Sequence, residues 1–229
     1  MKRKNRRGFT LVELLIVISL IAILSVAVLA TINPIEQANK ARDASTQNDA
    51  AEVLNAYERY YANKQSYPWV DVDEAATVTS VDVAWFGRSD YNGFGLCSLS
   101  ATSNPNTRCT DYDAYFGLLI QSDELKSSFL QKGYTSVAAG EPKYDSAGMS
   151  YLWVDKKAAS PDQNAIYVCY IPKAKSDRGQ PNNLKKPILT EAGVMTGFQQ
   201  TVAGDFVNGY PASVWTFATP ETSMFKCVP

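Results

Sequence analysis

The stretch "RRGFTLVELLIVISLIAIL", residues 6–24, decides how the rest of the sequence is interpreted. It opens an apolar run from Phe9 to Ile32 in which Glu13 is the only charged residue. A helix over this run, at about 1.5 Å per residue, is roughly 36 Å long, and the hydrocarbon core of a bilayer is about 30 Å thick. The sequence therefore predicts a membrane-spanning helix that carries one unexplained carboxylate.

Basic residues ahead of the run set its orientation. The first eight residues contain no acid and hold the basic side chains Lys2, Arg3, Lys4, Arg6 and Arg7. By the positive-inside rule, the chain after Ile32 lies outside the cytoplasm. A secretory signal cleaved after Ala30, within "SVAVLA", and a permanent single-span anchor both fit this orientation. Neither explains Glu13, because a charge at mid-membrane depth costs about 2.5–3.5 kcal/mol on insertion scales.

The segment "GFTLVELLIVISLIAIL" resembles the N-terminal signature of type IV pilins and of the related pseudopilins of type II secretion and competence systems. The resemblance rests on a short basic leader ending in Gly8, a phenylalanine at position 9 and a lone glutamate four positions later. In that family a membrane-embedded aspartyl protease, the prepilin peptidase, cuts after the glycine and methylates the new terminal amine. The resemblance thus implies cleavage between Gly8 and Phe9 and N-methylation of Phe9.

The same resemblance gives Glu13 a role in assembly. In a filament, the cationic amine of Phe9 in one subunit can lie beside Glu13 of its neighbour. Removing one partner of such a buried pair costs about 3–5 kcal/mol, so we expect the pair to fix how far each subunit slides along the next. The alternative is a glutamate that reaches from a helix end to the lipid headgroups. The implied partners are other copies of this chain or related pilins, prepilin peptidase, the pilus assembly machinery and the membrane.

The resemblance and the residue pattern together predict an α+β fold. Residues 1–8 form a leader, 9–32 a transmembrane or filament-core helix, 33–63 its amphipathic continuation and 64–229 a globular head. We expect one helix from Phe9 to Asn63, kinked or loosened at Asn33-Pro34, because proline removes a helical hydrogen bond. Helical spacing in its second half places an apolar stripe at Ala50, Leu54, Tyr57 and Tyr61.

An antiparallel sheet is expected in the head. "MSYLWV" (149–154) and "AIYVCYI" (165–171) are β-branched and aromatic runs and predict a hairpin. "ASVWTFAT" (212–219) and "MFKCV" (224–228) are further strand candidates, and residues 172–187 predict a polar loop. A short strand in 76–87 and one or two short helices in 111–130 complete the expected elements. The tryptophans in strand-like runs are expected in the core: Trp85, Trp153 and Trp215.

The four cysteines, Cys97, Cys109, Cys169 and Cys227, form no C-x-x-C pair. An even number after an export-type N-terminus predicts two disulfides, for which three connectivities exist. We favour Cys97–Cys109, which closes a polar loop, and Cys169–Cys227, which ties a strand to the C-terminus. The alternative is four free thiols in a cytosolic domain.

Composition argues against most catalytic and nucleic-acid-binding functions. The chain has no histidine, which removes the usual general base and His-ligated zinc sites. Net charge is −1 and five basic residues precede residue 9, so the remainder is acidic and lacks a broad nucleic-acid-binding face. We expect no catalytic residue, cofactor or metal site.

Two charged clusters have an alternative functional interpretation. Calcium-like ligand types occur at Asp71, Asp73, Glu74, Asp90 and Asn92, without the EF-hand spacing. A basic cluster that suits DNA, an acidic surface or an anionic sugar occurs at Lys173, Lys175, Arg178, Lys185 and Lys186. We expect both sets to be solvated loop residues.

The resulting expectation is a structural subunit of a type IV pilus-like surface filament serving adhesion, motility or DNA uptake. Its precursor is held in the cytoplasmic or inner membrane with its C-terminus outside, and the mature chain lies in an extracellular filament. The alternatives are a type II secretion or competence pseudopilin and a membrane-tethered module that binds sugar or DNA. An exported enzyme is the weakest, since without histidine it needs a carboxylate dyad and none is evident.

Overall fold

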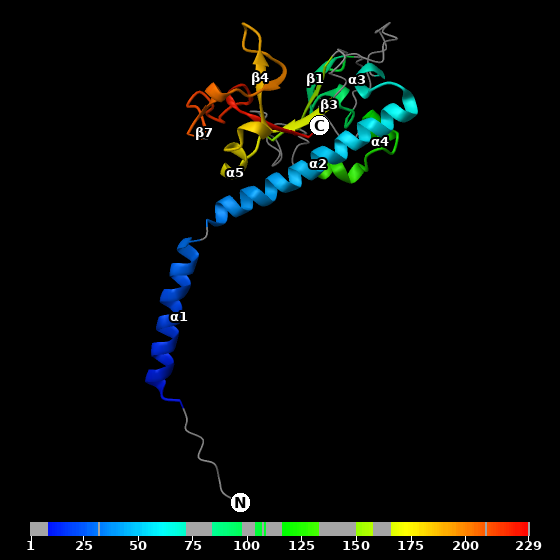
Figure 1. Cartoon of the computed structure of the whole chain (residues 1–229). Coiled ribbons are helices and arrows are strands. Elements are labelled where there is room, and N and C mark those ends of the chain that lie inside the picture. The colour runs from blue at the N-terminus through cyan, green and yellow to red at the C-terminus, as the bar shows by residue number, and fades with distance from the viewer. Residues whose placement is uncertain are drawn as a thin grey trace, which may run out of the picture. The chain divides into compact units, whose positions relative to one another are not determined.

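The computed structural model of the chain describes residues 9–31, 33–71, 84–97, 104–106, 108, 116–132, 150–157, 166–208 and 210–228. The chain divides into two compact units, Met1–Asn39 and Lys40–Pro229. The fold is α+β, with an N-terminal apolar helix, a long second helix and an antiparallel sheet, as predicted (Figure 1).

The predicted single helix is instead two helices, α1 (Leu11–Thr31) and α2 (Pro34–Lys64). The separation has a local cause. The side-chain Oδ1 of Asn33 accepts a hydrogen bond from the backbone N–H of Glu36 (3.2 Å), and its carbonyl accepts one from Gln37 (3.2 Å). Asn33 is thus an N-cap and Pro34 occupies the first helical position, where a missing N–H has no cost. The Asn33-Pro34 pair begins a helix, whereas the sequence analysis placed it inside one.

The second unit contains a six-stranded antiparallel sheet in the order β1-β2-β3-β8-β4-β5. Its strands are β1 (Trp85–Arg88), β2 (Trp153–Lys156), β3 (Ile166–Tyr170), β8 (Phe225–Val228), β4 (Leu184–Leu189) and β5 (Met195–Gln200). A separate two-stranded sheet pairs β6 (Phe206–Val207) with β7 (Tyr210–Pro211). A short helix, α3 (Pro68–Asp71), precedes the first strand. Further short helical turns lie between the strands: η1 (Asn92–Phe94), α4 (Leu118–Gln121), η2 (Ser127–Gln131), α5 (Lys175–Arg178), η3 (Pro181–Asn183), η4 (Ala203–Asp205) and η5 (Pro220–Thr222).

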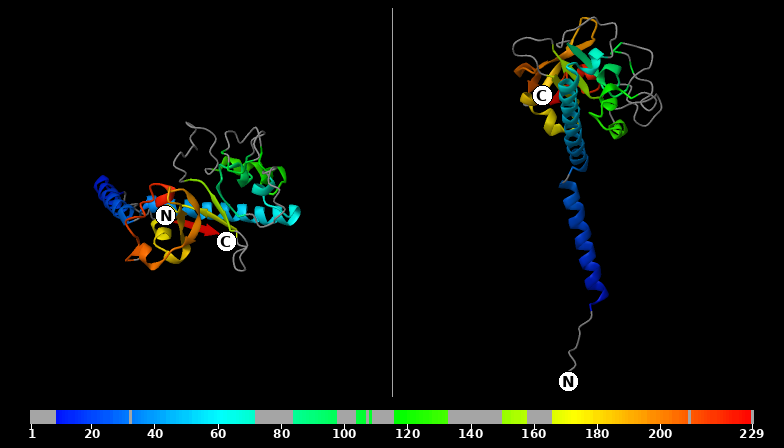
Figure 2. Two further views of the ribbon diagram at one scale, coloured as in Figure 1. Left: turned by 90° about the horizontal axis from the view of Figure 1, so that it is seen from above. Right: turned by 90° about the vertical axis from the view of Figure 1, so that its right-hand side faces the viewer.

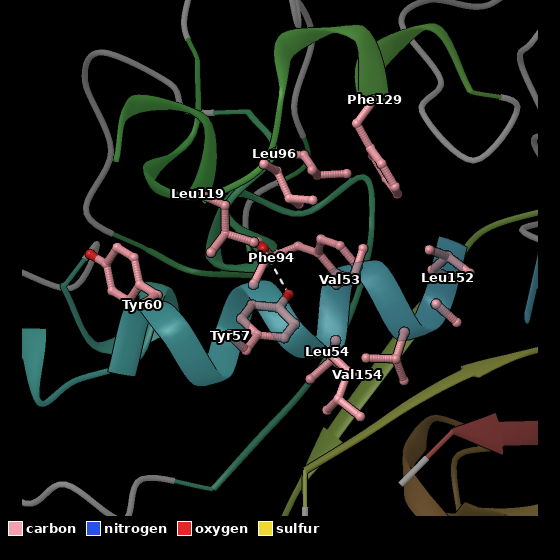
Figure 3. Close-up of a cluster of buried hydrophobic side chains, with 14 of the residues drawn as sticks. Val53, Leu54, Tyr57, Tyr60, Phe94, Leu96, Leu119, Phe129, Leu152 and Val154 are labelled. Carbon is pink, nitrogen blue, oxygen red and sulfur yellow. Dashed lines mark hydrogen bonds between the residues drawn. The ribbon is translucent and has the colours of Figure 1, made fainter. Parts of the chain in front are cut away.

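One face of the sheet packs against α2, which lies along it in both views of Figure 2. Val53, Leu54 and Tyr57 of α2 join Val154 of β2 and Val168 of β3 in one buried cluster, most of which Figure 3 shows. The Tyr57 hydroxyl donates to the Phe94 carbonyl (2.7 Å), so the phenol inside this core keeps a partner. The predicted stripe is confirmed for Ala50, Leu54 and Tyr57, but its last member is buried Tyr60, while Tyr61 is half-buried.

The opposite face of the sheet carries a second, smaller core. Successive strand residues point to opposite faces, so Trp153 and Cys169 lie away from the Val154–Val168 side. They pack with Phe198 of β5 and Phe225 of β8 in a cluster rich in aromatic contacts. Trp85 and Trp153 are buried as predicted, whereas Trp215 is half-buried and lies outside the strands.

The strand predictions have mixed outcomes. The β2–β3 hairpin and the C-terminal strand β8 are confirmed, and α4 and η2 supply the short helices expected within 111–130. The strand predicted at 212–219 is wrong, because this stretch forms turns. The short strand expected in 76–87 is β1, whose first residue is Trp85, while residues 76–83 lie outside the described part.

The polar loop predicted at 172–187 is also wrong at its end, because β4 begins at Leu184 and pairs with β5. The loop was predicted from the polar and basic side chains of this stretch, and the strand also contains Pro187, a residue that is rare inside sheets. The strand tolerates it because β8 pairs with β4 only at Leu184 and Lys185, so the backbone of Pro187 meets no strand on that side.

Candidate functional site

The described chain begins at Phe9, whose side chain is 82% exposed, and α1 follows within two residues. Thr10 and Glu13 form a reciprocal contact at the start of this helix. The Glu13 carboxylate accepts from the backbone N–H of Thr10 (2.8 Å) and from its hydroxyl (2.9 Å). The Thr10 hydroxyl in turn accepts from the backbone N–H of Glu13 (3.2 Å). This is a capping box, which satisfies two N–H groups that a helix start otherwise leaves unpaired.

The capping box is a local role for Glu13 that the sequence analysis missed. The pattern Thr-x-x-Glu before an apolar run was its signal. It adds to the predicted role in assembly without testing it, because a carboxylate has two oxygens and further acceptor capacity. Thr10 directly follows Phe9. The Glu13 carboxylate is therefore bonded to the residue next to the one that would carry the new amine. Gly8 lies outside the described residues, and its cleavage stays a prediction.

The surface of α1 is apolar on all sides. Leu11–Val28 has a mean hydropathy of 2.9, none of these side chains is buried, and the helix is long and apolar enough to cross a membrane. The two hydroxyl groups between Leu11 and Val28 are bonded within the helix. Ser19 donates to the Ile16 carbonyl (2.8 Å) and Ser25 to the Ile21 carbonyl (2.7 Å). Bonding of this kind suits a helix surrounded by hydrocarbon, where every polar group needs an internal partner.

The structure joins Cys169 to Cys227, the pair favoured from the sequence. The two residues are direct partners in the β3–β8 ladder, so the bond ties the C-terminal strand to the centre of the sheet. Cys97 is fully buried. Cys109 lies outside the described residues, so the Cys97–Cys109 pairing stays a prediction.

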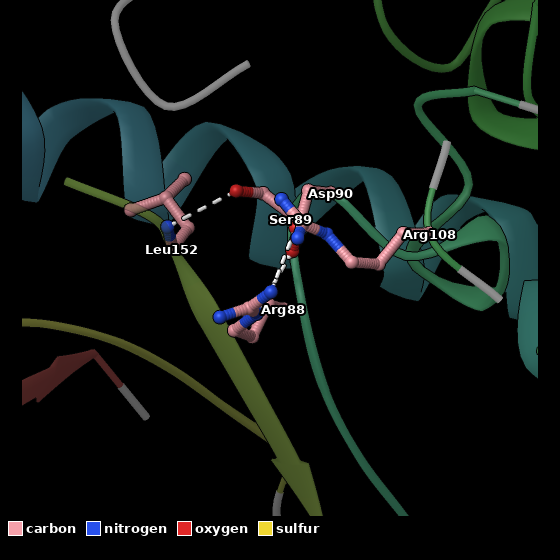
Figure 4. A network of polar contacts seen from close by, with 5 residues as sticks. All are labelled: Arg88, Ser89, Asp90, Arg108 and Leu152. Carbon is pink, nitrogen blue, oxygen red and sulfur yellow. Dashed lines mark hydrogen bonds and ion pairs between the residues drawn. The ribbon is translucent and has the colours of Figure 1, made fainter. Parts of the chain in front are cut away.

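The acidic residues with calcium-like ligand types do not converge. Asp90 is 1% exposed, which contradicts the expected solvated loop position. Its carboxylate accepts from Arg88 through both oxygens (2.9 and 2.8 Å) and from Arg108 (2.8 Å), as Figure 4 shows. Asp71 accepts from the hydroxyls of Tyr60 (2.6 Å) and Ser66 (2.8 Å).

Asn92 is buried in η1, and Asp73 and Glu74 lie outside the described residues. Among the residues that the structure describes, no group of three or more His, Cys, Asp or Glu side chains is placed to hold a metal ion.

The basic cluster is divided among separate contacts. Lys173 and Lys175 are exposed as expected. Arg178 stacks on the Phe217 ring at 4.1 Å, Lys185 lies 3.3 Å from the Tyr167 ring centroid, and Lys186 pairs with Asp205 (3.0 Å). The expectation of a solvated loop is therefore wrong for these last three residues.

The surroundings of Lys185 change the pKa of its side chain. Burial lowers the pKa of its ammonium, with Lys157 acting in the same direction and Asp155 opposing.

The comparisons with known proteins bear on the N-terminal segment alone. Residues 3–29 match the family described as the prokaryotic N-terminal methylation motif. This is the prepilin-type signature of type IV pilins and pseudopilins, so the resemblance seen in the sequence is confirmed. No curated protein and no solved structure matches the chain.

The matched segment defines a class of protein. Chains with this signature are structural subunits, and the motif implies processing by prepilin peptidase and assembly with other pilin-like subunits. The motif and the apolar α1 together fit a precursor anchored in the membrane. The match ends within α1 and says nothing of the residues that form the globular unit.

Proposed function

We propose that this chain is the subunit of a type IV pilus-like surface filament. Prepilin peptidase cleaves it between Gly8 and Phe9, Phe9 is N-methylated, and α1 enters the filament core. The observation that carries the proposal is the coincidence of the methylation motif with an exposed apolar helix whose single carboxylate is held beside the future N-terminus. Adhesion, motility and DNA uptake are the roles such a filament serves.

In the assembled filament, Glu13 has two tasks. It caps α1 through Thr10, and its charge neutralises the amine of Phe9 in an adjacent subunit. A carboxylate surrounded by apolar helices is costly unless it meets a cation, whereas the same carboxylate beside an amine aligns the two subunits. The charge, and not the cap, is therefore the property on which assembly depends.

A Glu13→Gln variant separates the two tasks. Glutamine also completes a capping box at this position, so the helix start is kept while the charge is lost. Thr10→Val is the matched control, because it removes the hydroxyl contacts and keeps the carboxylate. We expect Glu13→Gln to reduce the yield of sheared surface filaments at least about 100-fold, from the loss of a pairing worth about 3–5 kcal/mol, while Thr10→Val lowers it only a few-fold. Filaments of Glu13→Gln at normal yield, with the variant accumulating normally, contradict the proposal.

A pseudopilin of a secretion or competence system has the same N-terminal motif and is the second candidate. The two candidates differ in where the assembled chain is found, in surface filaments or in the membrane fraction. The surface-filament proposal predicts that this chain is recovered by mass spectrometry in filaments sheared from cells. Recovery only from the membrane fraction favours the pseudopilin.

A further inference from the structure

The edges of the six-stranded sheet face one another across a cleft of about 580 Å³. β1 and β5 are the two edge strands, and the sheet curves enough for Phe86 of β1 to meet Phe198 of β5 edge to face at 5.3 Å. A hydrogen bond from the Phe198 N–H to the buried Asp155 carboxylate on β2 (2.9 Å) holds β5 in this position. The volume is within the range of small-molecule sites, about 300–1,000 Å³.

Aromatic rings form much of the lining of the cleft. Phe86, Tyr91 and Trp153 line it together with Met195. Trp153 is nearly buried, whereas Phe86 and Tyr91 are half-buried and keep part of their ring surface accessible. Arg88 fixes these rings, because its guanidinium lies 5.1 Å from the Tyr91 ring and 5.6 Å from the Trp153 ring. Asp90 anchors that guanidinium through two hydrogen bonds (Figure 4).

The lining of the cleft also includes polar side chains, of which Glu221 contributes one exposed negative charge. Its polar side chains are Arg88, Asn106, Thr196 and Glu221. The charge of Arg88 is already met by Asp90, and Glu221 has no hydrogen-bond or ion-pair partner among the residues that the structure describes. An exposed carboxylate accepts from two adjacent hydroxyl groups at once. The Asn106 amide can still donate, although its oxygen accepts from the Trp85 indole N–H (3.1 Å), and the Thr196 hydroxyl, which donates to the Ile188 carbonyl (3.3 Å), can still accept.

We propose that this cleft binds an uncharged sugar unit of a glycan. A sugar ring presents an apolar C–H face, which suits the accessible parts of Phe86 and Tyr91, and vicinal hydroxyls, which suit Glu221. Glu221 disfavours an anionic ligand. This inference goes beyond filament assembly, since every residue that forms the cleft belongs to the unit Lys40–Pro229.

Saturation-transfer NMR on the full chain tests the proposal. The chain is kept in a polyoxyethylene detergent, because alkyl glycoside detergents compete for a sugar site. The neutral probes are the methyl glycosides of glucose, galactose, mannose and N-acetylglucosamine, and the charged comparison probes are glucuronate and choline. Glu221→Ala removes the carboxylate and Tyr91→Leu removes a ring at similar apolar bulk. Glu58→Ala, an exposed position on α2 outside the cleft, is the matched control.

We expect at least one neutral glycoside to receive saturation transfer. Its affinity should fall about tenfold or more in Glu221→Ala, the factor for losing a hydrogen bond to a charged group, and should also fall in Tyr91→Leu. Binding should be unchanged in Glu58→Ala. The proposal is overturned by absence of saturation transfer from the folded chain to any of the four glycosides, by preferential binding of glucuronate or choline, or by sugar binding that Glu221→Ala leaves intact. None of these outcomes depends on cleavage or assembly, so the filament proposal is tested separately.

Discussion

The two compact units differ in where their apolar side chains are buried. In α1 every described side chain from Leu11 to Val28 is exposed, although the helix is the most apolar part of the chain. In the unit Lys40–Pro229, apolar side chains fill two cores on the opposite faces of one sheet. The hydrophobic effect therefore stabilises the globular unit from within, whereas α1 gains the same stabilisation only from a membrane or from other helices.

The carboxylates of the two units show the same contrast. Glu13 is exposed, and among the described residues its carboxylate bonds only to Thr10 at the start of its own helix. Asp43 on α2 is 2% exposed and accepts from the backbone N–H groups of Lys173 (2.9 and 3.0 Å) and Ala174 (2.7 Å). One carboxylate is thus already committed to the fold of its own unit, and the other keeps capacity for a partner outside the chain.

The largest effect is expected when a leucine is replaced by alanine, once in each of the two units. Leu54 on α2 is 6% exposed and Leu20 on α1 is 55% exposed. We expect Leu54→Ala to lower the free energy of unfolding by about 2–5 kcal/mol because it leaves a cavity. Each kcal/mol lost lowers the Tm by roughly 2–4 °C. Leu20→Ala should leave this transition unchanged and weaken partition into vesicles. Thermal unfolding in detergent measures the Tm of the two variants. Equal Tm values contradict the difference in burial between Leu54 and Leu20.

A smaller effect is expected at Asp43. Asp43→Ala removes this acceptor from the N–H groups of Lys173 and Ala174, and the buried N–H of Ala174 left unpaired costs about 1–3 kcal/mol. Asp43→Asn keeps one acceptor oxygen and should lose less stability. Urea unfolding compares the two, with Glu52→Ala on the exposed side of α2 as control. If Asp43→Ala and Glu52→Ala unfold at the same urea concentration, the buried carboxylate does not hold this contact.

The smallest effect is a pH dependence at Asp155. Burial raises the pKa of this carboxyl, against the opposing effects of the Phe198 N–H, Lys157 and Lys185. The folded state then binds a proton more tightly than the unfolded state. The stability that this proton contributes is complete below the ordinary carboxyl pKa of about 3.9 and is lost as pH rises through the raised value in the folded state.

Asp155→Asn removes this titration and keeps an acceptor for Phe198. Its stability relative to the unsubstituted chain should therefore increase as pH rises across that window. Asp123→Asn, at an exposed position, should give a constant difference over the same range. Urea unfolding from pH 3 to 8 makes the comparison, and a difference for Asp155→Asn that stays flat or falls with pH argues against the assignment.

Local signals in the sequence were sufficient for much of the fold. The apolar run predicted α1, helical spacing predicted the buried face of α2, and β-branched and aromatic runs predicted β2, β3 and β8. Long-range pairing was not available to such reasoning. Strand β4 contains Lys185, Lys186 and Pro187, whose polarity and missing N–H indicate a loop until β5 is known to pair with them.

The site shows the same division. The methylation motif and Glu13 were identified from consecutive residues, and the capping box at Thr10 was visible there although it was missed. Buried polar residues were not predictable, because the burial of Asp43 and Asp90 depends on partners elsewhere in the fold. The cleft between β1 and β5 required the curvature of the whole sheet, which no local pattern encodes.

Mass spectrometry of the mature N-terminus tests the central claim most directly. The chain is purified from filaments sheared off the cell surface, and its first peptide is sequenced. We predict a chain that begins with N-methylated Phe9, so that the new amine lies beside the Thr10–Glu13 cap. A chain that begins at Thr31, or one that keeps residues 1–8 in assembled filaments, contradicts the account.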